Sequence, residues 1–203
     1  MPYTQQLPHL ILASGSAYRR ELLSRLHLPF EAIAPDIDES ALPHESPEQT
    51  ALRLAQQKAH AIAQKYPESI IIGSDQVATL EGEQIGKPGT HDAALKQLQK
   101  MRGKEVIFHT ALCLLDNRKV QSGHTVQLKN IQTLVRFRDL SDAELDAYLQ
   151  IEQPYDCAGS AKNEGLGIVI IEKIVSEDPT ALTGLPLITL TSMLRNIGVT
   201  FFK

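Results

Sequence analysis

The sequence predicts an α/β fold with a two-lobed mixed sheet, and two patterns carry this prediction. In the first half of the 203 residues, short apolar strands alternate with helical segments, which is the order of parallel β-α-β units. After residue 104, two long strand-like segments follow each other, which favours an antiparallel ribbon. We therefore expect a single domain over residues 1–203, with two lobes that share one core and a ligand cleft between them.

The first half of the chain gives clear signals for its elements. Strands are expected at 10–13, 30–34 and 69–74, helices at 19–26 and from Ser46 to Lys65, and an acidic loop over 36–44. The run Ser46-Pro47-Glu48-Gln49 predicts a helix start, because serine caps the N-terminus, proline fits the first turn and Gln49 completes a capping box.

The second half combines the ribbon with further helices. The expected elements are a helix after Thr90 to residue 101, strand-like segments over 105–115 and 119–137 joined at Asp116-Asn117, a helix opened by the capping box at Ser141, a strand over 168–171 and a final helix over 187–196. A glycine-rich turn over 159–167 leads into that short strand, and Gly198 fits just past the last helix.

Composition excludes several classes of protein. The net charge is −4 and no stretch is strongly basic, which disfavours binding to nucleic-acid polymers. Cys113 and Cys157 have no metal-binding spacing and do not suggest a secreted disulfide scaffold. The apolar runs are too short to span a bilayer, and the N-terminus lacks the pattern of a signal peptide. We expect a cytoplasmic protein without a membrane partner.

The first strand ends in a candidate anion site. Ser14-Gly15-Ser16 follows an apolar run, and Arg19-Arg20 comes directly after it, at the start of a helix. Free backbone N–H groups, serine hydroxyls, a guanidinium and the helix dipole all favour a phosphate there. The alternative is an ordinary strand–turn–helix junction with Ser16 as its N-cap.

Other charged residues interrupt apolar patterns. Lys58 lies on the apolar stripe of its helix, four residues after Leu54, so it needs an anionic partner unless its amine reaches solvent. Asp75 follows the core strand 69–74, a position that favours an acid that binds a metal or activates water over one that caps a turn. Lys87 in a Gly-Lys-Pro corner and Glu39 in the acidic loop are weaker candidates, for phosphate and metal respectively.

Together these residues suit the hydrolysis of a phosphoanhydride. Cations would neutralise the phosphates, a metal would polarise them and a carboxylate would activate water. The seven histidines are scattered, and the sequence shows no pattern typical of a serine–histidine–aspartate triad.

Several of these residues belong to ordered blocks. The blocks are Leu-Ala-Ser-Gly-Ser-x-x-Arg-Arg at 12–20, Asp38-Glu39, Arg53 with Lys58-Ala59, Ser74-Asp75-Gln76, Gly86-Lys87-Pro88, Cys157-Ala158-Gly159-Ser160 and Gly184-Leu185-Pro186. In these blocks the chain resembles the Maf-like nucleotide pyrophosphatases over nearly its whole length. The resemblance implies the two-lobed fold shared with inosine-triphosphate pyrophosphatases, a homodimer, and hydrolysis of a nucleoside triphosphate to the monophosphate and pyrophosphate.

The resemblance also implies roles for individual residues. Asp75 matches the general base. Six further residues match positions that bind phosphate or a divalent cation (Mg²⁺, Mn²⁺ or Co²⁺) in the family: Ser14, Ser16, Arg19, Glu39, Lys58 and Lys87. Of these, Glu39 is the expected metal ligand, together with Asp75.

Three further positions separate the branches of this family. The dTTP/UTP branch has arginine at position 18, threonine at 76 and glutamine at 164, whereas this chain has Tyr18, Gln76 and Glu164. It resembles the 7-methyl-GTP branch, with tyrosine where tryptophan is expected. An electron-rich ring can stack on the cationic N7-methylated base, and a carboxylate can accept from its donor edge. A preference for dTTP, UTP or another modified nucleotide, and a nucleotide-binding regulator without turnover, remain the alternatives.

Overall fold

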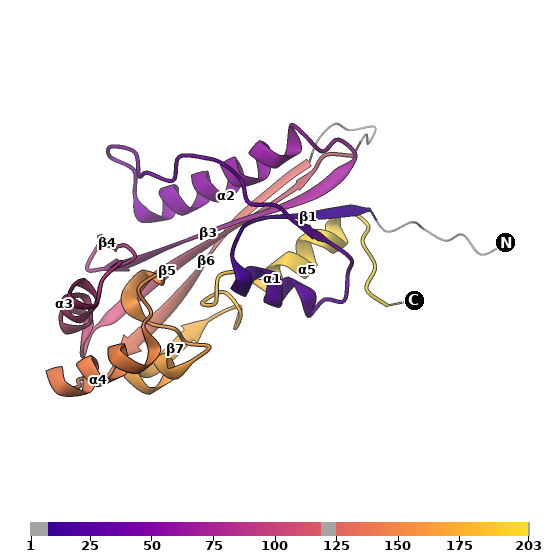
Figure 1. Ribbon diagram of the computed structural model, residues 1–203. Coiled ribbons are helices and arrows are strands. Elements are labelled where there is room, and N and C mark those ends of the chain that lie inside the picture. The colour runs from indigo at the N-terminus through magenta and orange to yellow at the C-terminus, as the bar shows by residue number, and fades with distance from the viewer. Residues whose placement is uncertain (1–7, 119–124, 203) are drawn as a thin grey trace.

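The computed structural model describes residues 8–118 and 125–202 and contains a seven-stranded mixed sheet in the order β2-β1-β3-β5-β6-β7, with β4 paired to β3 (Figure 1). The strands are β1 His9–Ala13, β2 Glu31–Ala32, β3 Ser69–Leu80, β4 Glu83–Ile85, β5 Glu105–Asp116, β6 Thr125–Phe137 and β7 Ile171–Ser176. The helices are α1 Ala17–Ser24, α2 Pro47–Ala63, α3 His91–Met101, α4 Asp142–Glu152, α5 Leu187–Asn196 and the short 3-10 turns η1 Ala158–Ser160 and η2 Leu166–Ile170. Within the described ranges, no helix combines the length and the apolar character that crossing a bilayer requires.

The two faces of the sheet are covered differently. Helix α2 lies along one face, and α1 and α5 lie on the other (Figure 1). Side chains alternate between the faces along each strand. In β5, Ala111 and Cys113 pack in the cluster under α2, whereas Leu112 packs with α1 and α5, and Phe108 packs with α3 and α4. The α1/α5 cluster and the α3/α4 cluster therefore form two lobes on one face of a continuous sheet.

An interruption in the pairing of β3 lies between these lobes. Strand β1 runs parallel to β3 as far as the pair Ala13–Gly73, and β4 runs antiparallel to it from the pair Ala78–Ile85 onward. Residues 74–77 lie between these two ladders, while β5 pairs with β3 along the whole stretch on the other side. The chain segments that leave β1 and β4 therefore flank an opening at the edge of β3.

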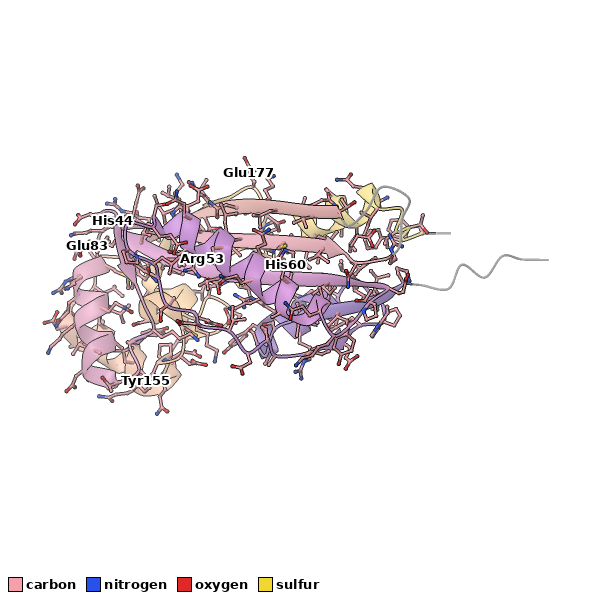
Figure 2. The ribbon with its side chains drawn as sticks, turned by 90° about the horizontal axis from the view of Figure 1, so that it is seen from above. His44, Arg53, His60, Glu83, Tyr155 and Glu177 are labelled. Carbon is pink, nitrogen blue, oxygen red and sulfur yellow. The ribbon has the colours of Figure 1, made fainter. Side chains whose placement is uncertain are left out.

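Gly73 allows α2 to lie unusually close to β3. A Cβ atom at Gly73 would come within 2.1 Å of the Ala55 carbonyl oxygen and 3.0 Å of the Ala59 nitrogen, both backbone atoms of α2. Figure 2 looks down on α2, from which Arg53 and His60 project. The close approach brings the middle of α2, including Lys58, against the opening in the sheet.

The capping predictions are confirmed. Ser46 and Ser141 both form complete capping boxes at the starts of α2 and α4. Gly198 follows α5 with a φ of +85°, the left-handed conformation that glycine adopts readily.

Two expected strands end differently from the prediction. Strand β3 does not stop at residue 74 but continues to Leu80, because β5 pairs with it beyond residue 74. The strand that ends at this level of the sheet is β1, whose last pair with β3 is Ala13–Gly73. Residues 168–170 belong to the 3-10 turn η2, and β7 begins only at Ile171. The reason is the tight turn before it, where the Gly167 amide donates to the Lys162 carbonyl and a Cβ would lie 2.5 Å from the Lys162 backbone.

Other boundaries moved by a few residues. Helix α1 begins at Ala17 and ends at Ser24, β2 is limited to Glu31–Ala32, and the short strand β4 had no sequence prediction. The expected segment 119–137 is described from Thr125, and residues 119–124 lie outside the described part of the chain.

Candidate active site

A cleft of about 840 Å³ opens at the interruption in the sheet, between the lobes. The ten predicted site residues line it, although they come from six separate segments: Ser14, Ser16, Tyr18, Arg19, Glu39, Lys58, Asp75, Gln76, Lys87 and Glu164. Arg20, which the sequence placed beside Arg19, is exposed and is not part of the lining. Residues 14–19 follow β1, and Lys87 follows β4. Asp75 and Gln76 lie in the stretch of β3 that has a partner strand only on the β5 side. The cleft therefore depends on where β1 and β4 stop.

The centre of the cleft is a buried charge cluster. The Lys58 Nζ lies 2.6 Å from Asp75 Oδ1 and 2.8 Å from Glu39 Oε1, with Lys58 only 5% exposed and Asp75 only 6%. The amine of Lys58 therefore does not extend into solvent, which answers the question that its place on the apolar stripe raised. A buried ammonium between two carboxylates has the pairing that burial of charge requires.

Burial gives the two carboxyl groups different acidities. Desolvation raises the pKa of Asp75, against the opposing effects of Lys58 and Arg19. Glu39 is more exposed. Desolvation raises its pKa too, but the hydrogen bond and charge of Lys58, together with the charges of Lys87 and Arg19, outweigh this effect, so the pKa of Glu39 is lowered. Asp75 is therefore the better proton acceptor of the pair, since a raised pKa makes a carboxylate a stronger base.

The turn after β1 serves both interpretations that its sequence left open. Ser16 is the N-cap of α1 and accepts from the Arg19 amide at 3.4 Å, while Ser14 Oγ accepts from the Ser16 amide at 3.1 Å. Because each hydroxyl accepts in these bonds, its own proton remains to donate to an anion. Capping and anion binding are therefore compatible at this turn.

Arg19 is fixed to the far wall of the cleft. Its Nε donates to the Gly184 carbonyl at 2.9 Å, and Ser74 Oγ donates to the same oxygen at 2.9 Å. Burial lowers the pKa of Arg19, while Asp75 and Glu39 act in the opposite direction. An arginine remains protonated despite such a shift, so the group supplies a permanent cation beside Asp75.

Helices α2 and α3 hold the two loops that carry Glu39 and Lys87. Arg53 on α2 contacts Glu45 with Nε and Nη2 at 2.7 Å each, and Nη2 also donates to the Ser40 carbonyl at 2.9 Å. Arg53 projects from α2 on the side of the loop that carries His44 (Figure 2). On the other loop, the Gly86 carbonyl accepts from Gln97 on α3 at 3.0 Å. The sequence blocks contained Arg53 but gave it no role.

The cleft lining also contains the three residues predicted to contact the base, Tyr18, Gln76 and Glu164. The ring of Tyr18 is half-buried and Glu164 is exposed at the rim. Gln76 Nε2 donates to Thr110 Oγ1, Ala181 O and Leu182 O at 2.9–3.1 Å. Its amide protons are therefore occupied by the protein, and contact with a ligand would have to use the amide oxygen.

Sequence reasoning missed two charged residues beside Tyr18. The Lys162 ammonium lies 5.9 Å from the centre of the Tyr18 ring and 2.9 Å from Glu152 Oε1 at the end of α4. The only available signal was the position of Lys162 in the glycine-rich turn two residues before Glu164, which an ordinary surface lysine shares.

The carboxylates of the cleft suit a cation that is shared with a substrate. Over residues 8–118 and 125–202, no group of three or more histidine, cysteine, aspartate or glutamate side chains could hold a metal ion by itself. Glu39 and Asp75 nevertheless meet at one point, the Lys58 amine. Magnesium is commonly held by one or two carboxylates together with water and substrate phosphates, which this pair fits.

The chain is similar to known proteins over nearly its whole length. The sequence profile of the Maf-like protein family matches residues 9–197. The chain is 62% identical over 196 residues to the 7-methyl-GTP pyrophosphatase of Cupriavidus pinatubonensis, covering 97% of this chain and 96% of that protein. It is 60% identical over 195 residues to the 7-methyl-GTP pyrophosphatase of Ralstonia nicotianae, covering 96% and 98%.

Among solved structures, that of the Staphylococcus aureus Ham1 protein aligns with a TM-score of 0.45 at 14% identity, over 64% of this chain and 72% of that one. This similarity is too weak to support an argument about the site. The family profile spans almost all of the chain, and each of the two relatives aligns with this chain over nearly the full length of both proteins. The chain therefore belongs to the Maf-like protein family.

Proposed function

We propose that the protein hydrolyses 7-methyl-GTP to 7-methyl-GMP and pyrophosphate. The observation that carries the proposal is the distribution of charge along the cleft, and the names of the two relatives support it. 7-Methyl-GTP is anionic at its phosphates and cationic at its base, so a cleft that fits it needs opposite charge at its two ends.

The described side chains have this distribution. At one end, cations outnumber carboxylates: Arg19, Lys58 and Lys87 surround Glu39 and Asp75. Around Glu164 on the cleft lining, the charged groups that act on this carboxylate are Lys162, Glu152 and Asp156, so carboxylates outnumber the cation at this second end. We therefore assign the first end to the phosphates and the second to the base.

The mechanism follows from the position of Asp75. Its carboxylate accepts a proton from water, and the oxygen of that water attacks the α-phosphorus. The bond from the α-phosphorus to the bridging oxygen breaks, and pyrophosphate leaves with the bonding electrons. Lys58, Lys87 and Arg19 offset the charge that develops on the phosphate oxygens. Glu39 and Asp75 would hold a divalent cation (Mg²⁺, Mn²⁺ or Co²⁺), which when bound polarises the phosphates.

The proposal is tested by pyrophosphate release from 7-methyl-GTP, GTP, dTTP and UTP in parallel, with each divalent cation and with EDTA. We expect the highest kcat/KM for 7-methyl-GTP and no turnover in EDTA. A preference for dTTP or UTP would retain the mechanism and reject the assignment of the base end. Binding without turnover of any nucleotide would favour a regulator.

Replacement of Tyr18 by arginine is expected to lower kcat/KM for 7-methyl-GTP selectively, by about tenfold. The added guanidinium repels the cationic base and the ring that stacks on it is lost, effects that together reach one to two kcal/mol in partly buried sites. Measurement of kcat/KM on 7-methyl-GTP and GTP decides the point. Tyr18→Phe is the control, since it keeps the ring. An equal loss on both nucleotides would argue against contact with the base.

Homodimeric assembly, the absence of binding to nucleic-acid polymers and a cytoplasmic location stay predictions from the sequence and its resemblance. None of them is needed for the chemistry assigned to the cleft.

A further inference from the structure

A lysine lies beside the ring that is assigned to the base. The Lys162 Nζ is 5.9 Å from the centre of the Tyr18 ring. If a cationic base stacks on this ring, a free ammonium beside the ring would work against it, because like charges repel in a partly desolvated site. The arrangement therefore needs something that cancels the charge of Lys162.

Glu152 is placed to cancel it. Its Oε1 lies 2.9 Å from the Lys162 Nζ, and the side chains of Glu152 and Lys162 are 12% and 28% exposed, so the pair is partly shielded from salt and water. The hydrogen bond with Lys162 lowers the pKa of Glu152 below its usual range, and the same contact raises the pKa of Lys162. Both groups therefore remain ionised near neutral pH and form a neutral pair.

The turn that carries Glu164 is built around the same carboxylate. Glu152 Oε2 accepts from the Leu166 amide at 2.7 Å, and a Cβ at Gly165 would lie 2.8 Å from that oxygen. The ion pair with Lys162 and the amide contact with Leu166 thus attach both sides of Glu164 to the end of α4. One side chain controls the charge beside Tyr18 and the position of the rim acid.

We propose that Glu152 is a specificity-positioning residue, which neutralises Lys162 so that the base end of the cleft accepts a cationic base. The inference rests on the proposed function, because that function places the base at Tyr18. Glu152 acts through Lys162 and the turn, and it has no part in the attack on phosphorus.

The test uses the full-length protein with Glu152→Gln, Lys162→Met and the double variant. For each, kcat/KM is measured on 7-methyl-GTP and GTP, and the affinities for 7-methyl-GMP and GMP are measured by calorimetry. Glutamine keeps an oxygen for the Leu166 amide but cannot neutralise Lys162. Asp142→Asn is the matched control, since it removes one carboxylate of an ion pair with Arg102 at the other end of α4, about 15 Å away.

We expect Glu152→Gln to lower the preference for the methylated nucleotide over GTP by about tenfold, through KM and not kcat. Lys162→Met keeps the wild-type preference or increases it, and the double variant returns to within about threefold of wild type, because the uncompensated cation is gone. Asp142→Asn leaves the preference unchanged.

An equal loss on both nucleotides that the double variant does not repair would overturn the proposal and leave Glu152 as a scaffold for the turn. The proposed function is judged separately, on the wild-type protein alone. If wild type prefers another nucleotide, the change in the 7-methyl-GMP to GMP affinity ratio between wild type and Glu152→Gln still decides the role of Glu152.

Discussion

Replacement of Asp75 by asparagine is expected to reduce pyrophosphate release by about 10³-fold while the protein still folds. Asparagine has the same shape as aspartate, but its amide cannot accept the proton of the attacking water, and general-base catalysis commonly contributes factors of 10²–10⁴. Lys58 loses one of its two carboxylate partners and keeps Glu39 at 2.8 Å, so it is not left as an isolated buried charge. The measurement is steady-state turnover, with circular dichroism to establish folding.

Asp178→Asn provides the matched control for that experiment. Asp178 is also buried, at 1% exposure, but it accepts from the amide of Thr189 and the hydroxyl of Thr180 and does not line the cleft. We expect this variant to lose stability with kcat unchanged. Turnover close to wild type in Asp75→Asn would mean that another group removes the proton.

Replacement of Gly73 by alanine is expected to destabilise the protein by about 3 kcal/mol, at the upper end of the range for overpacking. The new methyl group would lie 2.1 Å from the Ala55 carbonyl oxygen, and a backbone atom cannot rotate away as a side chain can. Helix α2 must move off the sheet instead. For a protein of this size, the melting temperature should fall by roughly 6–12 °C.

The same variant should reduce turnover, because Lys58 lies one turn after Ala55 on the helix that moves. Gly86→Ala is the control for the loss of a glycine: no atom lies within 4 Å of its added Cβ, and its stability should change by less than about 0.5 kcal/mol. A melting temperature of Gly73→Ala equal to wild type would contradict the close contact between α2 and β3.

Local chemistry explains which parts of the structure could be predicted. The capping boxes at Ser46 and Ser141 consist of neighbouring residues, so the sequence contains all the information for those helix starts. The place of Lys58 on the apolar stripe of its helix followed from the spacing of residues, whereas the alternative that its amine reaches solvent stayed open. Both predictions needed no knowledge of a partner element.

Features that depend on distant partners were predicted poorly. Asp75 was identified, but for the wrong reason: it lies within β3, and the place where it becomes accessible is set by the end of β1, more than sixty residues earlier in the chain. The pair Glu152–Lys162 was missed because nothing in either local sequence shows that the end of α4 meets the glycine-rich turn. The 3-10 turn at 166–170 depends on a backbone contact at Gly167 that composition does not reveal.

Where β3 lines the cleft, its successive side chains point to opposite faces of the sheet, and this has a consequence for how members of such a family can diverge. Asp75 points to the face where α2 supplies Lys58, whereas Gln76, the next residue, reaches the 181–182 segment on the opposite face. In the proposed function, the group assigned to proton transfer and one group assigned to the base thus lie on opposite sides of one strand. A substitution at Gln76 can therefore alter the contacts on its side of the strand while the pairing of Asp75 with Lys58 on the other side is retained.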